Sequence, residues 1–594
     1  MRDEKGMKDE GRGMNKKAFN LNKHSFIPHP SALIPSFILH PSSFILSLLV
    51  AVVLVYGVLY PNLYVLFAAS TVEGGGRFSL VGLLEILSRR AVLEAAATSI
   101  GLSFLTVLFC ALVGIPLAFL FERYQFPARR LFAALAALPL VLPPLVGTVA
   151  FIFLCGESGI LARAVQWAFG LQSAPWSLRG WTAILLFHTY TMYPFFYVLT
   201  GAGLRRIDAG LSEAARSLGA RPARVLFRVV LPQLSPSLIA AALLTFMTSM
   251  ASFSAPLLFG GEVRPLTLEI YSARQRGDVP TALGETVLLA FVSLCALIFF
   301  QRYEGTRRFA AAALKGAVKR RVTLARGRGR ILAIVCATLF TIILMLPVAT
   351  LVLVSFASEG KWTTQALPPA YTLSNYARIF AEPHRLEVIV NSLLMSGLAA
   401  LAALLWSFCA TAVVIGKKES VWRRAVSLLI LIPWALPGTV VAVAIAEAYG
   451  GPNLLTGSFV LVGTFWILPV IYFLRFMPLV VRAVQASVEQ MDTALEEAAG
   501  SLGANWWRRF LRVRLPLVWP GALAGTLLAF VIALGEYVAS VLVFVPRNRP
   551  VSIAIAAELR DFNLGTAAAY GVLLMLMIAV SMILAARLER SPQD

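Results

Sequence analysis

The same polar segment occurs twice in this chain. Residues 213–220 read Glu-Ala-Ala-Arg-Ser-Leu-Gly-Ala, residues 497–504 read Glu-Ala-Ala-Gly-Ser-Leu-Gly-Ala, and a Leu-Pro pair follows each copy at 231–232 and 515–516. The second copy lies 284 residues after the first, close to half of the 594-residue chain. Charged groups avoid the interior of a bilayer, so we expect both copies to face water in the same way. The repeat predicts a chain of two related halves.

Around these copies the sequence is strongly apolar. Of all residues 58% are hydrophobic and only 14% are charged, whereas soluble domains are about half apolar and about a quarter charged. Many apolar runs reach the ~20 residues that a helix needs to cross a bilayer. The composition predicts an all-α polytopic membrane protein with about 12 transmembrane helices, arranged as two parallel six-helix repeats.

The expected spans follow the apolar runs. In the first half they lie near 44–69, 93–121, 132–155, 182–203, 237–259 and 283–301, and in the second near 331–356, 389–415, 426–447, 459–478, 521–545 and 569–588. An even number of spans per half places both halves in the membrane the same way round. The segments Pro194–Tyr197 and Pro469–Tyr472 also match, at a spacing of 275 residues.

These spans divide the chain into four parts. We expect a low-complexity basic tail at 1–43, within which the true translation start stays open, a first membrane domain at 44–301, a basic cytoplasmic linker at 302–330, and a second membrane domain at 331–594.

The net charge of +22 has a topological explanation. Most of the 52 Lys and Arg residues fall on segments on the same side as the N-terminus, and such residues accumulate on the cytoplasmic side. We therefore expect a multi-pass protein of the cell (inner) membrane with both termini cytoplasmic, and no nucleic-acid partner.

The repeated segment predicts a helix, a glycine turn and a second helix. Ser212 can cap a helix that starts at Glu213, Gly219 can end it, and Pro232 is expected to end the second helix before the next span. An amphipathic helix lying on the membrane is the alternative. Two copies with equal internal spacing favour a docking element for a partner.

This pattern resembles the EAA loop of binding-protein-dependent ABC importer permeases, and the resemblance covers roughly 85–300 and 380–590. In that family the loop forms a coupling helix in a cleft of the ATP-hydrolysing subunit. The resemblance implies two ATP-binding cassette subunits and an extracytoplasmic solute-binding protein as partners. It assigns the coupling role to Glu213, Ala214, Ala215, Gly219, Leu231, Pro232, Glu497, Ala498, Ala499, Gly503, Leu515 and Pro516.

Among these importers, the fused double permease looks most like those for ferric iron. The stretches 253–261 and 268–271 add some support. Thiamine, phosphonate and polyamine permeases are similar, so the substrate stays open between these classes. Transport would proceed by alternating access.

No catalytic or cofactor motif accompanies the repeat. A P-loop is absent, so ATP would be used by separate subunits, and we expect this chain to bind no cofactor and to be no enzyme. No His or Cys spacing predicts a metal site. A 12-span secondary transporter fits the span count, and a membrane-embedded enzyme is a third class, but neither needs a doubled docking loop.

Polar residues inside spans are candidates for the substrate pathway. Glu536 and Tyr537 fall inside a predicted span, at the position that matches Ser252 and Phe253 in the first half. We expect Glu536 to face a water-filled interior or to bond to the opposite half. For His188 and Glu447 a structural or interfacial role is favoured.

Overall fold

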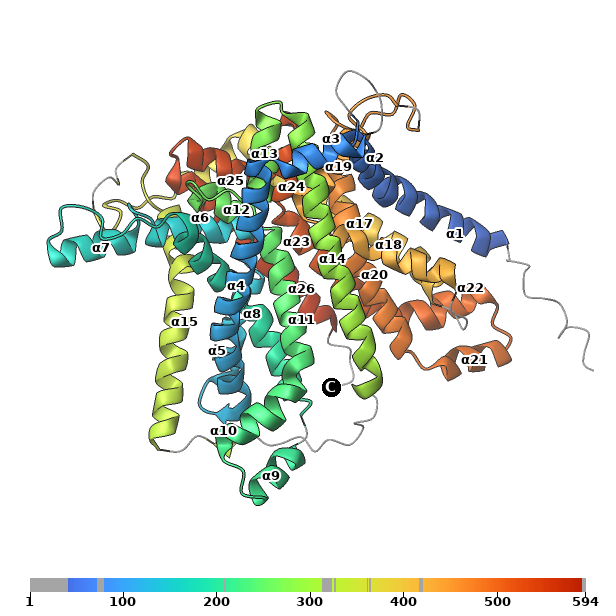
Figure 1. The fold of residues 1–594 in the computed structure, drawn as a ribbon, viewed down its shortest axis with the longest axis horizontal. Coiled ribbons are helices and arrows are strands. Elements are labelled where there is room, and N and C mark those ends of the chain that lie inside the picture. Colours follow the sequence, from blue (N-terminus) through green and yellow to red (C-terminus); the bar gives the residue numbers. More distant parts are fainter. Residues whose placement is uncertain are drawn as a thin grey trace, which may run out of the picture. The chain divides into compact units, whose positions relative to one another are not determined.

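The computed structural model describes residues 41–71, 79–207, 209–311, 323–324, 327–360, 362, 365–415, 420–453 and 455–589. Two compact units, Met1–Ile45 and Leu46–Asp594, divide the chain. Helices make up almost all regular structure of the described residues (Figure 1). Residues 1–40 of the predicted tail, and residues 312–322 and 325–326 of the predicted linker, lie outside them.

The elements of the first half precede the linker. In chain order they are α1 (Pro41–Leu54), η2 (Val55–Leu59), α2 (Tyr60–Ala69), α3 (Leu80–Ser88), α4 (Arg90–Arg123), β1 (Tyr124–Gln125), α5 (Arg129–Ala136), η3 (Leu138–Leu140), α6 (Pro144–Cys155), α7 (Ile160–Phe169), α8 (Gly180–Leu204), α9 (Ala209–Ser217), α10 (Pro222–Val225), η4 (Leu226–Val230), α11 (Leu231–Met250), α12 (Ser254–Phe259), α13 (Leu266–Gln275) and α14 (Val279–Ala311).

The second half repeats this order of elements. It contains β2 (Thr323–Leu324), α15 (Arg328–Ser355), α16 (Ser374–Ala381), α17 (Pro383–Val414), α18 (Val421–Ala435), α19 (Gly438–Ala448), α20 (Ile467–Gln490), α21 (Thr493–Ser501), α22 (Trp506–Arg509), η5 (Phe510–Arg514), α23 (Leu515–Leu534), α24 (Val538–Val543), η6 (Pro546–Asn548), α25 (Val551–Arg560) and α26 (Leu564–Glu589). The long helices α4, α8, α11 and α14 thus correspond to α17, α20, α23 and α26. The strands β1 and β2 pair in parallel and tie part of the linker to the loop after α4.

Ten helices of the described chain are long and apolar enough to cross a membrane, or eleven if the bent pair α18 and α19 is one span. The 25-residue α8 is not among them, because the polar run His188–Thr191 lies at its centre. An all-α polytopic membrane protein is confirmed, with slightly fewer spans by this measure than the expected twelve.

Two predicted spans are not straight helices. The span at 426–447 is α18 followed by α19, bent by 108°, and the span at 132–155 is α5, the turn η3 and α6. Prolines cause both breaks, because they lack an N–H donor and restrict the residue before them. Pro139 and Pro143 stand in the first break, and Pro437 stands in the second.

Three further predicted spans are displaced. The helix expected at 459–478 is α20, which begins at Ile467, because residues 453–466 form a loop with a bridge between Asn453 and Gly457. The spans expected at 237–259 and 521–545 each join a long helix, α11 or α23, to a separate short one, α12 or α24. Hydropathy alone does not reveal these breaks, since the residues on both sides are apolar.

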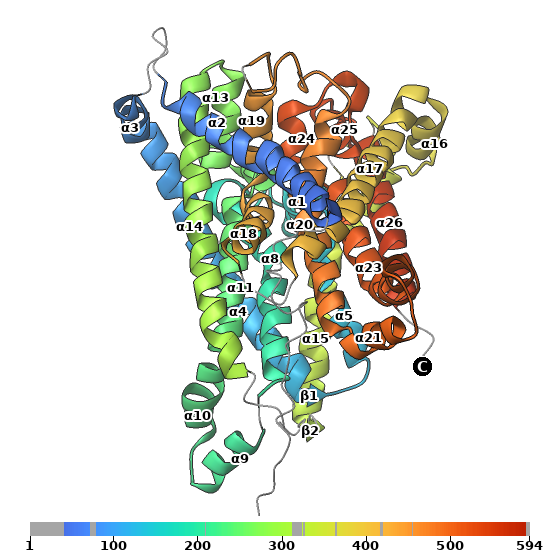
Figure 2. The same ribbon diagram turned by 90° about the vertical axis from the view of Figure 1, so that its right-hand side faces the viewer.

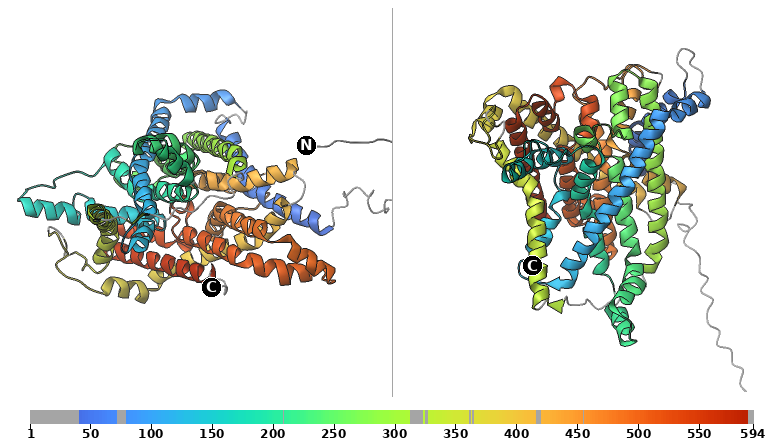
Figure 3. Two further views of the ribbon diagram at one scale, coloured as in Figure 1. Left: turned by 90° about the horizontal axis from the view of Figure 1, so that it is seen from below. Right: turned by 60° about the vertical axis from the view of Figure 1, so that its left-hand side comes forward.

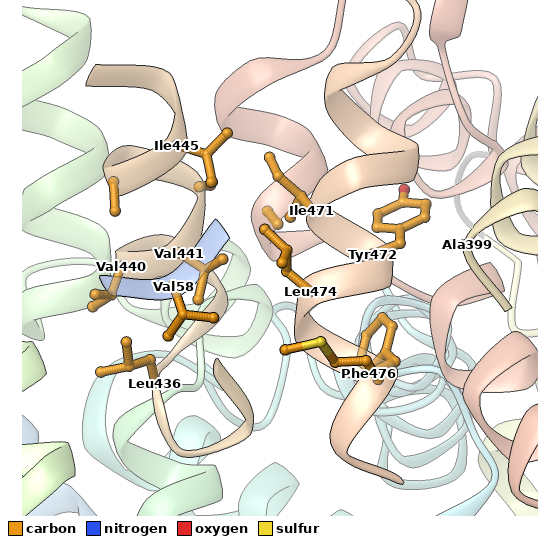
Figure 4. Close-up of a cluster of buried hydrophobic side chains, with 14 of the residues drawn as sticks. Val58, Ala399, Leu436, Val440, Val441, Ile445, Ile471, Tyr472, Leu474 and Phe476 are labelled. Carbon is orange, nitrogen blue, oxygen red and sulfur yellow. The ribbon is translucent and has the colours of Figure 1, made fainter. Parts of the chain in front are cut away.

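The first membrane helix of each half packs against the other half. Helix α2 contacts α19, and α15 contacts α5 and α6 as well as α26 (Figure 2). Tyr449 donates a hydrogen bond of 2.6 Å to the carbonyl of Tyr56, and Tyr60 donates one of 3.0 Å to Asn453. Val58 is buried beside Leu436 and Val441 of the second half (Figure 4). The two halves therefore form one interlocked membrane body.

Equivalent positions in α8 and α20 lie 284 residues apart. A Cβ on Gly203 would lie 2.6 Å from Ser237 Oγ, and a Cβ on Gly521 would overlap Ser487 Oγ. These are the same contact with glycine and serine exchanged. The internal prolines Pro194 and Pro478 obey the same spacing. The expected match of Pro194 with Pro469 is therefore wrong, and His188 corresponds to Tyr472.

Candidate coupling elements and gate

The two repeated segments fold alike. Helices α9 and α21 have nine residues each, and α9 lies at the lower end of the molecule in Figures 1 and 3, beyond the long helices. Both helices end on a glycine with φ of +80°, Gly219 and Gly503. In each copy the next residue, Ala220 or Ala504, donates 3.0 Å to the carbonyl of Ala215 or Ala499. This is the six-to-one bond of a Schellman cap, which needs a left-handed residue.

The start of the first helix differs from the prediction. Helix α9 begins at Ala209, so Ser212 lies inside it, buried, and Glu213 is not in its first turn. In the second copy the Asp492 carboxylate caps α21 by accepting from Ala494 N at 2.9 Å. Aspartate caps helices as well as serine does, and here it does so one turn earlier.

The two elements present the same exposed side chains. Leu218 and Leu502 are each 89% exposed, and Glu213, Ala214, Glu497 and Ala498 are also exposed. The second alanines, Ala215 and Ala499, are half-buried. A leucine at that exposure buries almost no apolar surface within this chain. Each element therefore presents one exposed leucine, small alanines and one carboxylate, a surface that suits a partner's cleft.

The copies differ in their own stabilisation. In the second, Glu496 pairs with Arg514 at 3.4 Å. Arg216 of the first copy stands where the second has Gly500. The exposed glutamate, alanine and leucine are thus common to both copies, and the differences lie around them.

In each copy the second short helix, α10 or α22, continues into a membrane helix without a break. A π turn, η4 or η5, joins α10 to α11 and α22 to α23, with N–H of Leu231 bonded to Leu226 O and N–H of Leu515 bonded to Phe510 O. The expectation that Pro232 ends the second short helix is wrong, since the run Pro222–Met250 is one span. A π turn can accommodate a proline soon after it, although proline has no N–H to donate. Pro232 and Pro516 stand at this position after η4 and η5.

These continuous helices end at matching breaks. Residues 251–253 separate α11 from α12, and residues 535–537 separate α23 from α24. Phe253 and Tyr537 are equivalent residues at these breaks, almost fully buried, and their ring centroids lie 6.0 Å apart. Equivalent residues that touch each other lie at the axis relating the two halves. The pair thus lies where the two halves meet.

Glu536 is placed differently from the expectation. Its carboxylate accepts 2.9 Å from Ala539 N and lies 2.5 Å from Arg475 Nη1. The side chain is only 8% exposed, and both contacts are within its own half. It therefore neither faces a water-filled interior nor bonds to the opposite half. Sequence reasoning missed Arg475, although a lone arginine in the predicted span 459–478 was a signal.

Ser252, the counterpart of Glu536, belongs to a neutral network. Its hydroxyl lies 2.7 Å from His188 Nε2. The other ring nitrogen of this fully buried histidine lies 3.1 Å from Thr106 Oγ1 and 3.3 Å from Ser249 Oγ. Glu447 instead forms an ion pair with Arg274 of the first half. In the described part of the chain no group of three or more His, Cys, Asp or Glu residues could hold a metal ion.

The sequence of this chain is similar to those of known proteins. The model of the family "Binding-protein-dependent transport system inner membrane component" matches twice, at residues 111–307 and 409–593. The Probable ABC transporter permease protein y4fN of Sinorhizobium fredii is 31% identical over 86% of this chain and 90% of its own length. The Ferric transport system permease protein FbpB of Actinobacillus pleuropneumoniae is 24% identical over 90% of this chain and 77% of its own. The Molybdenum transport system permease protein ModB of Mycobacterium tuberculosis is 33% identical over 32% and 71%.

Proposed function

This chain belongs to the family of binding-protein-dependent transport system inner membrane components, and we propose that it is the permease of an ATP-driven importer, with both membrane domains in one polypeptide. It is a multi-pass inner-membrane protein, and such permeases work with ATPase and binding-protein partners. The observation that carries the proposal is the pair of equivalent exposed elements α9 and α21. Both termini are proposed to be cytoplasmic.

Each element is proposed to dock one ATP-binding cassette subunit. The docking residues are those of the two repeated segments, with Glu213 and Glu497 as the charged contacts and Leu218 and Leu502 as the apolar ones. Because two such elements are present in one chain, the working complex holds one copy of it, two ATPase subunits and one solute-binding protein. ATP is hydrolysed by the partners, and this chain is no enzyme and binds no cofactor.

The structure supports a direct route from the ATPase to the substrate. After the glycine turn that ends each docking element, a single span containing α11 or α23 leads to the break at residues 251–253 or 535–537. Closure of the ATPase subunits would shift both helices and separate Phe253 from Tyr537, which gives alternating access. We call the contact between Phe253 and Tyr537 the gate. Ser252, Glu536 and Tyr537 are proposed to lie at this gate.

Ferric iron is the proposed cargo. The support is that FbpB, named for ferric transport, matches both halves of this chain, whereas ModB matches about a third of it. The Glu536 carboxylate does not add to this support, because Arg475 balances its charge. Molybdate is the alternative that ModB suggests, and thiamine, polyamine and phosphonate stay possible classes.

Uptake by the reconstituted complex tests the proposal. Proteoliposomes that contain this chain and its ATPase are expected to accumulate radioactive iron only under two conditions. ATP must be present on the side of the membrane that carries the ATPase subunits, and the binding protein must be supplied. Uptake of molybdate instead of iron would overturn the iron assignment and leave the importer intact. Uptake that needs no ATPase would overturn the importer and favour a secondary transporter.

A further inference from the structure

We infer that Arg475 is a positioning residue for the gate: its ion pair with Glu536 is a latch that holds Tyr537 against Phe253 until the ATPase closes. This inference rests on the proposed function above and names how that gate is kept shut. It assigns a role to the charged pair other than contact with the substrate.

The latch holds the backbone that carries Tyr537. Glu536 precedes Tyr537 directly, and its carboxylate caps α24 through Ala539 N. Its backbone carbonyl accepts two further hydrogen bonds, 2.8 Å from Ser540 Oγ and 2.9 Å from Ser552 Oγ. Arg475 joins this cluster to α20. The position of the Tyr537 ring therefore depends on whether the carboxylate stays with the guanidinium.

The neighbouring helix leaves room for the arginine. A Cβ on Gly438 would lie 2.5 Å from Arg475 Nη1, so a larger residue there would require the guanidinium to shift. Both side chains are largely buried, with exposures of 16% and 8%. A buried charge that loses its partner is strongly disfavoured, so the pair stays closed unless a larger movement opens it.

The latch exists in one half only. The residues equivalent to Arg475 and Glu536 are Thr191 and Ser252. Thr191 bonds to its own helix, 3.0 Å from Phe187 O. The first-half break is held instead by the neutral contact of Ser252 with His188. The gate is thus fastened by charge on the side of Tyr537 and by neutral hydrogen bonds on the side of Phe253.

The charges argue against a cargo site. The charges of Arg475 and Glu536 balance each other, so the pair as a unit attracts neither a cation nor an anion. Neither Nε nor Nη1 of Arg475 makes a hydrogen bond within the described residues, so its contact with Glu536 is an ion pair and the guanidinium has donors left for a new acceptor when the gate moves. A rearranging latch needs such a donor.

The test uses the full complex of this chain, its ATPase and its binding protein. Glu536→Gln and Arg475→Gln are each expected to raise ATP hydrolysis in the absence of binding protein about tenfold, because the closed gate loses its fastening. Arg475→Lys keeps the charge and is expected to stay within about twofold of wild type. Glu94→Gln, which breaks the exposed pair of Arg90 and Glu94, is the matched control.

Three outcomes separate the possible roles. A rise in basal hydrolysis with a smaller stimulation by binding protein supports the latch. A change in half-saturating cargo with unchanged basal hydrolysis overturns it in favour of a substrate contact. A parallel fall of folded protein and all activities, with no change in the ratio of basal to stimulated hydrolysis, overturns it in favour of a purely structural pair. Wild-type complex without ATP-dependent uptake would contradict the proposed function itself.

Discussion

Changing Glu213 and Glu497 together to lysine is expected to reduce uptake more than about tenfold while the protein still inserts in the membrane. Both glutamate side chains are exposed, on α9 and α21. Lysine reverses the charge that each element presents to its ATPase partner, so binding is expected to weaken. Because both elements are altered, binding is expected to weaken at both sites.

The measurement is co-purification of the ATPase with the variant chain, beside uptake by the same cells. Glu94→Lys, an exposed glutamate on α4 outside both elements, is the matched control and should behave as wild type. The single variants need not be equal, because Arg216 of the first copy is Gly500 in the second. Wild-type uptake by the double variant would remove the coupling assignment.

Replacing Gly203 with serine is expected to destabilise the membrane body by about 1–3 kcal/mol, as overpacking in a tight core does. The new Cβ would lie 3.0 Å from Ser237 Cβ and 2.9 Å from Leu234 Cδ2. Small residues let the backbones of two membrane helices approach closely, and here α8 and α11 already do so.

The matched rescue is the double variant Gly203→Ser with Ser237→Gly. It recreates the arrangement of Ser487 and Gly521 in the second half, so most of the lost stability should return. Thermal unfolding in detergent measures both effects. Gly397→Ser, at a glycine with no neighbour within 4 Å, is the control. A double variant no more stable than Gly203→Ser would contradict the 284-residue register.

The sequence predicts the helical class and the position of the two repeated helix–turn–helix segments, because these follow from composition and local pattern. The bends do not follow in the same way. A hydropathy average treats 426–447 as one apolar run, whereas its two parts meet at 108°. The prolines mark where such a break falls, but the angle depends on packing against other helices.

Contacts between residues far apart in the chain are the second feature that the sequence does not predict. Arg475 and Glu536 are 61 residues apart in the chain, and nothing local indicates that they meet. The packing of α2 against α19 is likewise a contact between distant parts. Such pairings are decided by the fold as a whole. Sequence alone therefore points to Glu536 as unusual without showing that its charge is balanced.

The mass of the intact complex, purified in mild detergent and measured under native conditions, tests the central claim most directly. The presence of two equivalent docking elements on one chain predicts one copy of this 64.4 kDa protein with two ATP-binding cassette subunits. A complex with two copies of this chain, or a chain that purifies without any ATPase under conditions that preserve uptake, would contradict it.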